Sequence, residues 1–170
     1  MTPAFQLGPH PASAHSAIHS IEVAVWQDAE RWRFRYVVDG AGDFVLPDPQ
    51  EPGRADELWR TTCFEAFIGS ASGSYTELNF APSGQWAAYD FDAPREGMRN
   101  SATACEVWLE GGEGWIAVEA AVSGEFPDHA PLGLSAVVEE ADGTKSYWAL
   151  AHCSDAPDFH DPDCFVARLP

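Results

Sequence analysis

The sequence contains very little positive charge. Nine Lys and Arg residues stand against 27 Asp and Glu residues in a chain of 170, which gives a formal net charge of −18, and Lys145 is the single lysine. Nucleic acids and anionic membranes bind proteins through clustered cationic side chains. We therefore expect neither as a partner, and the composition favours a neutral or cationic small-molecule ligand or a protein partner.

Long apolar runs are also missing. No stretch approaches the roughly 20 apolar residues that a membrane helix needs. The first residues lack the basic start and the apolar core of a signal peptide. We therefore expect a cytoplasmic protein with no membrane span.

Cysteine is scarce, and no two cysteines form a CxxC pair of the kind used in zinc or redox motifs. In a cytoplasmic protein, Cys63, Cys105, Cys153 and Cys164 are expected to be reduced thiols. Three of them lie within apolar runs, so the sequence predicts buried thiols that act as small hydrophobic side chains.

Aromatic residues and short alternating segments are abundant. Seven Trp and ten Phe residues make the chain too apolar for disorder, and its length suits one domain over residues 1–170. In residues 31–38, aromatic side chains alternate with arginines, which is typical of a strand with one buried face. Strands are expected at 18–25, 31–38, 62–68, 75–80, 85–91, 105–110, 115–122, 134–139, 146–150 and 164–169, with a long loop over 43–56 and a short helix around 95–100. About ten strands predict an all-β domain, namely a two-sheet antiparallel β-sandwich of jelly-roll type.

Two carboxylates interrupt aromatic strands. Glu65 shares a strand face with Cys63 and Phe67, and Glu77 shares one with Tyr75 and Asn79, because side chains alternate along a strand. If the two segments form a hairpin, both glutamates come to one sheet face. Paired carboxylates can be the acid and base of a hydrolase, or they can bind sugar hydroxyls, or they can be solvated surface groups.

Several segments resemble the DOMON-like superfamily, which is related to carbohydrate-binding module family nine. They are residues 58–68, 75–86, 95–99, 146–152 and 157–160. The similarity extends from about Phe5 to Pro170, and the branch most resembled comprises small bacterial proteins. The resemblance implies a β-sandwich whose concave sheet face binds a sugar or a haem, usually without catalysis.

The resemblance also implies a binding site. The positions that match the carbohydrate-binding relatives are Trp59, Glu65, Arg95 or Arg99, and Trp148, and further contacts are expected from Tyr75, Glu77, Asn79 and Tyr89. An indole face packs on the apolar side of a pyranose, while carboxylates, amides and guanidinium groups bind its hydroxyls. On this basis Trp148→Ala should abolish sugar binding and leave the fold intact.

Three alternatives stay open. The haem-binding relatives suggest Met98 with His152 or His160 as axial ligands of haem b. The C-terminal aspartates Asp155, Asp158, Asp161 and Asp163 favour a solvated acidic loop, with calcium binding as the alternative. A glycoside-acting enzyme would use Glu65 and Glu77, although the chain carries no GxSxG, HExxH, Walker or dinucleotide motif.

Overall fold

Strands form nearly all of the regular structure. The computed structural model describes residues 2–13, 16–40, 42 and 44–170, and its regular elements are strands and two short 3-10 turns, so the predicted all-β class is confirmed. Ten strands are five residues or longer: β1 (Ala4–Pro9), β2 (Ser20–Asp28), β3 (Arg31–Asp39), β6 (Cys63–Gly69), β7 (Tyr75–Phe80), β8 (Gln85–Phe91), β10 (Ala104–Gly112), β11 (Trp115–Ser123), β12 (Pro131–Glu140) and β13 (Lys145–Ala149).

The remaining elements are short. Four strands have two residues each: β4 (Phe44–Val45), β5 (Gly53–Arg54), β9 (Arg99–Asn100) and β14 (Ala167–Arg168). The 3-10 turns are η1 (Leu58–Arg60) and η2 (Pro162–Cys164). No described helix is long and apolar enough to cross a bilayer.

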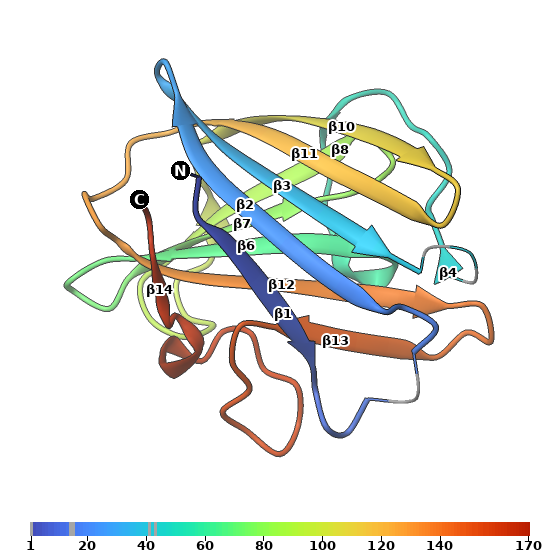
Figure 1. Cartoon of the computed structure of the whole chain (residues 1–170). Helices are drawn as coiled ribbons and strands as arrows, with labels where there is room; N and C mark the ends of the chain where they lie inside the picture. Colours follow the sequence, from blue (N-terminus) through green and yellow to red (C-terminus); the bar gives the residue numbers. More distant parts are fainter. Residues whose placement is uncertain (1, 14–15, 41, 43) are drawn as a thin grey trace.

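The strands form one continuous, barrel-like sheet. Its order is β10-β11-β3-β2-β1-β13-β12-β6-β7-β8-β5. All pairs along this path are antiparallel except β5 with β8, which is parallel. Strand β1 pairs with β2 on one side and with β13 on the other (Figure 1), so it joins the two halves that the sequence predicts as separate sheets.

The main core lies between these two halves. Alternate residues of each strand point inward, as the period-2 pattern predicts, and the aromatic rings meet across the interior. The ring of Phe34 in β3 lies 5.7 Å from that of Phe80 in β7, and the ring of Tyr36 lies 5.1 Å from that of Phe64 in β6. Each fully buried apolar side chain of this kind stabilises the fold by roughly 1.5–3 kcal/mol.

The outer face of β3 holds three of the arginines in ion pairs, the first of which joins Arg31 to Glu106 at 3.2 Å. Arg33 contacts Asp28 at 3.2 Å and Glu119 of β11 at 3.5 Å. Arg35 pairs with Glu110 and, at 3.2 Å, with the same Glu119. These cations therefore neutralise acids on their own surface.

Several local expectations are wrong. The segment 164–169 is not one strand, because Pro162 begins the 3-10 turn η2 and only Ala167–Arg168 pairs in the sheet. Residues 95–100 are not helical, because Arg95 (φ 59°) and Gly97 (φ 71°) adopt the left-handed conformation. Strand β1 was not expected. Cys63, Cys105 and Cys164 are buried as predicted, but Cys153 is exposed.

Candidate functional site

The second half of the sheet carries functional side chains on the face opposite the core. Strands β6 and β7 form an antiparallel hairpin in which Glu65 is opposite Asn79 and Phe67 is opposite Glu77. The two glutamates are therefore diagonal neighbours on one face, which is the arrangement expected from a hairpin. Tyr89 of β8 is opposite Glu77 on that same face.

A cavity of about 760 Å³ opens over this face. Its size lies within the range of roughly 300–1,000 Å³ that is usual for small-molecule sites. Residues from the sheet, from the η1 region, from the loop after β8 and from the C-terminal loop line it together: Asp56, Glu57, Trp59, Glu65, Glu77, Tyr89, Phe91, Arg95, Met98, Arg99, Asn100, Val137, Tyr147, Pro157, Phe159 and His160.

Glu65 lies at the base of the cavity and is held from both sides of the sheet. Its side chain is only 3% exposed, and the hydroxyl of Ser135 in β12 donates to its Oε2 at 3.2 Å. From the core side, the Tyr36 hydroxyl donates to the backbone oxygen of Glu65 at 2.7 Å. Burial raises the pKa of Glu65 well above its ordinary value, and the nearby charge of Glu77 raises it further. Burial therefore favours the neutral form of the Glu65 carboxyl group, which can donate a hydrogen bond.

Glu77 is the second buried carboxyl group. It is 5% exposed, and burial raises its pKa to about 7, against a smaller lowering effect of the Arg95 charge. The Nε2 atom of His160 lies 3.6 Å from its Oε2. At neutral pH, Glu77 exists as a mixture of the acid and the carboxylate, so it can both donate and accept hydrogen bonds.

His160 is a neutral side chain that is fixed by Tyr75. The Tyr75 hydroxyl lies 2.7 Å from His160 Nδ1 and accepts the backbone N–H of Arg95 at 3.1 Å. Burial, reinforced by the Arg95 charge, lowers the pKa of His160 to about 4. If Nδ1 accepts from Tyr75, the Nε2 proton faces Glu77. Tyr75 therefore positions the imidazole and does not itself line the cavity.

Two further predicted residues have contrasting positions. The Tyr89 hydroxyl lines the cavity and donates to Asp56 Oδ1 at 2.5 Å, and burial raises the pKa of Tyr89. Asn79 does not line the cavity. Its side chain is close enough to favour the charged form of Glu77, but its amide atoms make no well-formed hydrogen bond with the described residues. This leaves a buried polar group next to Glu65, which normally carries a cost.

Arginines from the loop after β8 form one side of the cavity. Arg95 donates to Asp158 of the C-terminal loop at 3.0 Å, and Arg99 donates to Asp92 at the same distance. Both lining side chains are more than half exposed. The two guanidinium groups therefore lie at the mouth of the cavity, above the buried glutamates.

Aromatic side chains stand at the same opening. Trp59 in η1 is 47% exposed and has the Arg60 guanidinium 5.4 Å from its ring centroid. Tyr147 of β13 lies 6.1 Å from the ring of Phe159 in the C-terminal loop. The exposed indole of Trp59 and the phenol of Tyr147 lie above the polar floor of the cavity. They provide the apolar surface on which a sugar ring or another planar group stacks.

Trp148 is not part of this site. It is 4% exposed, packs in the core between the two sheet halves and donates from Nε1 to the Ser146 hydroxyl at 2.9 Å. Alternation along β13 turns its neighbour Tyr147 to the cavity instead. The residue expected from the resemblance is therefore one position away from the residue that lines the site.

Of the two expected pairs of haem ligands, the structure separates Met98 from His152 and brings Met98 and His160 to the same cavity. Met98 and His160 both line the cavity. His152 instead donates from Nε2 to the backbone oxygen of Gly8 at 2.7 Å and packs against His10. His160 Nδ1 is already engaged by Tyr75, so only its Nε2 faces the cavity side.

The four C-terminal aspartates do not form a common ligand cluster among the described residues. Asp158 binds Arg95 and accepts the backbone N–H of His160 at 3.0 Å. Asp161 caps η2 by accepting from Asp163 N. Asp155 and Asp163 are exposed. Two of the calcium candidates thus have other contacts: Asp158 is in an ion pair with Arg95, and Asp161 caps η2.

Some lining residues were not predicted as site residues, although Pro157 and Phe159 lie in the segment 157–160 that carries the resemblance. Asp56, Phe159 and Pro157 lie in irregular segments far apart in the chain, so no periodicity relates them to the strands. Val137 could have been found from the alternation of β12, whereas alternation along β13 does not choose between Tyr147 and Trp148. The loop residues needed the three-dimensional structure.

No family model matches the chain, and no curated protein matches its sequence. Among solved structures, the fold is similar to that of a "putative carbohydrate-binding protein" from Bacteroides uniformis ATCC 8492. The TM-score is 0.60 and the sequence identity 13%, with 94% of this chain and 84% of that chain covered. At this identity the similarity concerns the fold alone.

Proposed function

We propose that this protein binds a small, saccharide-like ligand in the cavity over β6–β8 and does not transform it. The observation that carries the proposal is the combination of two buried carboxyl groups, Glu65 and Glu77, with the exposed indole of Trp59 at the same opening. A sugar matches this combination of polar and apolar groups, because it carries hydroxyls around its rim and apolar C–H surface on its faces.

The protonation of the two glutamates suits hydroxyl groups. A neutral Glu65 donates one hydrogen bond and accepts others, and Glu77 near its pKa of about 7 does either. Both carboxyl groups are buried and neither can supply a positive charge, so the negative charge of an anionic ligand would be uncompensated at the base of the cavity. A neutral polyol is therefore the ligand class that the base of the cavity favours, and the arginines at the mouth allow an acidic sugar to extend outward.

We also propose a more specific fold type and family for this chain. The two halves that enclose the core would be the layers of a jelly-roll-like sandwich, and the chain would be a DOMON-like protein related to carbohydrate-binding module family nine. Support comes from the matching segments around Trp59, Glu65 and Glu77 and from the similarity of fold.

A ligand screen tests the proposal. Purified protein is screened against neutral, amino and acidic sugars by thermal shift and glycan array, and each hit is measured by calorimetry. We expect Trp59→Ala to weaken binding at least about tenfold, which is about 1.4 kcal/mol. Trp108→Ala is the matched control, because Trp108 is 45% exposed, close to the 47% of Trp59, but lies on β10 outside the cavity. Equal affinities of wild type and Trp59→Ala for every hit would refute the site.

The same preparation discriminates the other two functions. A Soret absorbance band that follows Met98 and His160 by mutation would establish haem binding instead. Cleavage of a glycoside substrate that is lost in both Glu65→Gln and Glu77→Gln would establish a glycosidase. We expect neither, and either result would replace the non-catalytic sugar-binding proposal.

A further inference from the structure

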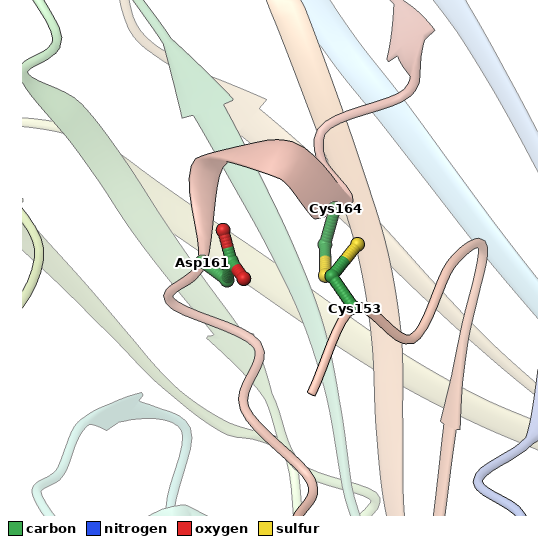
Figure 2. A group of neighbouring side chains, drawn as sticks. All are labelled: Cys153, Asp161 and Cys164. Atoms are coloured by element: carbon green, nitrogen blue, oxygen red, sulfur yellow. The ribbon is translucent and has the colours of Figure 1, made fainter. Parts of the chain in front are cut away.

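A second cluster of reactive side chains lies in the C-terminal segment, outside the lining of the cavity. Cys153 follows β13, while Asp161 and Cys164 stand at the two ends of η2 (Figure 2). Their ligand atoms, the two Sγ atoms and a carboxylate oxygen, all lie within 4.8 Å of one another. Among the described residues, this is the single group of three or more metal-ligating side chains at such close range.

We propose that Cys153, Asp161 and Cys164 bind a thiophilic divalent cation, of which Zn²⁺ is the best match. Zinc is held by thiolates at about 2.3 Å and by carboxylate oxygens at about 2.0–2.2 Å, usually in a tetrahedron. Two thiolates and one carboxylate supply three corners, and water supplies the fourth. Binding replaces the two thiol protons, which are released to solvent.

The spacing of the three groups suits a metal ion. A tetrahedral zinc centre places its ligand atoms roughly 3.5–4 Å apart, so groups within 4.8 Å need a side-chain adjustment of about an ångström or less. Cys153 is exposed and can rotate without displacing core residues. Its exposure also leaves one side of the centre open to water.

The present contacts of the ligands leave them available. One oxygen of Asp161, Oδ1, accepts the N–H of Asp163 at 3.0 Å, and Oδ2, which accepts no hydrogen bond from the described residues, can coordinate a metal. The Cys164 thiol makes a weak contact of 3.8 Å with the Asp158 backbone oxygen. Neither thiol is in a disulfide, and the Asp161 carboxylate beside them adds a ligand atom that a disulfide would not use. This third group is the reason to infer a metal site and not a disulfide.

The metal would fix the loop that covers the cavity. Its ligands flank the segment 154–160, which contributes Pro157, Phe159 and His160 to the cavity and carries Asp158, the partner of Arg95. This segment contains no strand or helix. A metal centre at the two ends of this segment would fix its position, as hydrogen bonds between strands fix the parts of the cavity that the sheet forms. The metal site stands independently of the identity of the cavity ligand.

Zinc binding to the reduced, full-length protein tests the proposal. A competition titration with a chromogenic chelator, checked by native mass spectrometry, should give one Zn²⁺ per chain. Cys153→Ser and Cys164→Ser should each weaken that binding at least about tenfold, and Cys105→Ala, which removes a buried thiol of β10, should leave it unchanged. Cobalt substitution gives a second measurement, because the thiolate-to-cobalt charge-transfer band should lose about half its intensity in Cys153→Ser.

Asp161→Asn is the decisive variant, since asparagine caps a helical turn as well as aspartate does but binds zinc poorly. It should weaken zinc binding with an unchanged melting temperature, whereas Asp163→Asn, its exposed neighbour, should behave like wild type. The proposal is overturned if all five variants, the three at the ligand site and the two controls, bind zinc alike. It is equally overturned if the reduced protein binds no zinc and mild oxidation instead yields a Cys153–Cys164 disulfide.

Discussion

Tyr147 and Trp148 are consecutive in β13 and face opposite sides of the sheet. Tyr147 lines the cavity beside Phe159, whereas Trp148 is enclosed between the two halves of the sheet, with its indole N–H bonded to Ser146. One strand thus supplies an aromatic side chain to the ligand site and another to the core. The two side chains should therefore respond to mutation in separate ways.

Trp148→Ala should destabilise the protein and not act as a binding mutation. Removal of a fully buried indole typically costs about 3–5 kcal/mol, so the free energy of unfolding in urea should fall by that amount. Tyr147→Ala should change the unfolding free energy by less than about 1 kcal/mol and weaken ligand binding. A Trp148→Ala protein of normal stability would contradict the burial of the indole.

The buried glutamates make stability depend on pH. Glu77 is surrounded by titratable and charged groups from every neighbouring element: Glu65 of β6, Tyr75 of its own strand, Tyr89 of β8, Arg95 of the following loop and His160 of the C-terminal loop. Burial outweighs these charges and raises the pKa of Glu77 from 4.5 to about 7. The folded state therefore retains a proton that the unfolded chain has already lost.

Wild-type stability should accordingly fall as the pH rises from about 4.5 to about 7. Glu77→Gln cannot ionise, so at pH 8 it should be more stable than wild type by up to ~3 kcal/mol, and at pH 4 the two should be equal. Urea unfolding at pH 4, 6 and 8 measures this. Glu22→Gln on the exposed face of β2 is the control, and an advantage of Glu77→Gln that is the same at every pH would contradict the assigned cause.

Gly97 allows the loop after β8 to bring Arg99 to the cavity. Its φ is 71°, and a Cβ there would overlap the carboxylate of Asp92, which binds Arg99 at 3.0 Å. Gly97→Ala should therefore cost stability and displace Arg99, which weakens ligand binding. Gly73→Ala, at a φ of 89° with open space around it, carries the backbone cost of about 1–2 kcal/mol alone. If the two variants bind ligand equally, Arg99 does not contribute.

The parts of the site that follow from local pattern could be predicted from the sequence. Alternation placed Glu65 and Glu77 on one face, and the short turn between their strands predicted the hairpin that makes them neighbours. The same rule failed to choose between Tyr147 and Trp148, because both faces of β13 are covered and both accept an aromatic side chain. Burial on two sides removes the polar alternation that marks an exposed face.

The geometry of the covering loops could not be predicted for a different reason, although the resemblance named His160 as a candidate haem ligand. Asp56, Phe159 and His160 reach the cavity through irregular backbone, where position depends on tertiary contacts such as Tyr75 to His160 and Tyr89 to Asp56. These are contacts between residues 33 and 85 positions apart, and no spacing rule encodes them. The proximity of Cys153 to Cys164 could not be predicted for the same reason, because an irregular segment separates the two residues in the sequence.

The pairing of β1 affects how the chain folds. Gly8 is paired in register with Ala149, so β1 cannot join the two halves of the sheet until residue 149 has been synthesised. Until then the edge of β2 that pairs with β1 can be exposed, and without β1 the edge of β13 is exposed as well; unpaired edges are sites for association with other chains. Deletion of residues 2–9 should therefore produce a chain that aggregates during synthesis, in which the missing strand can be supplied by another molecule.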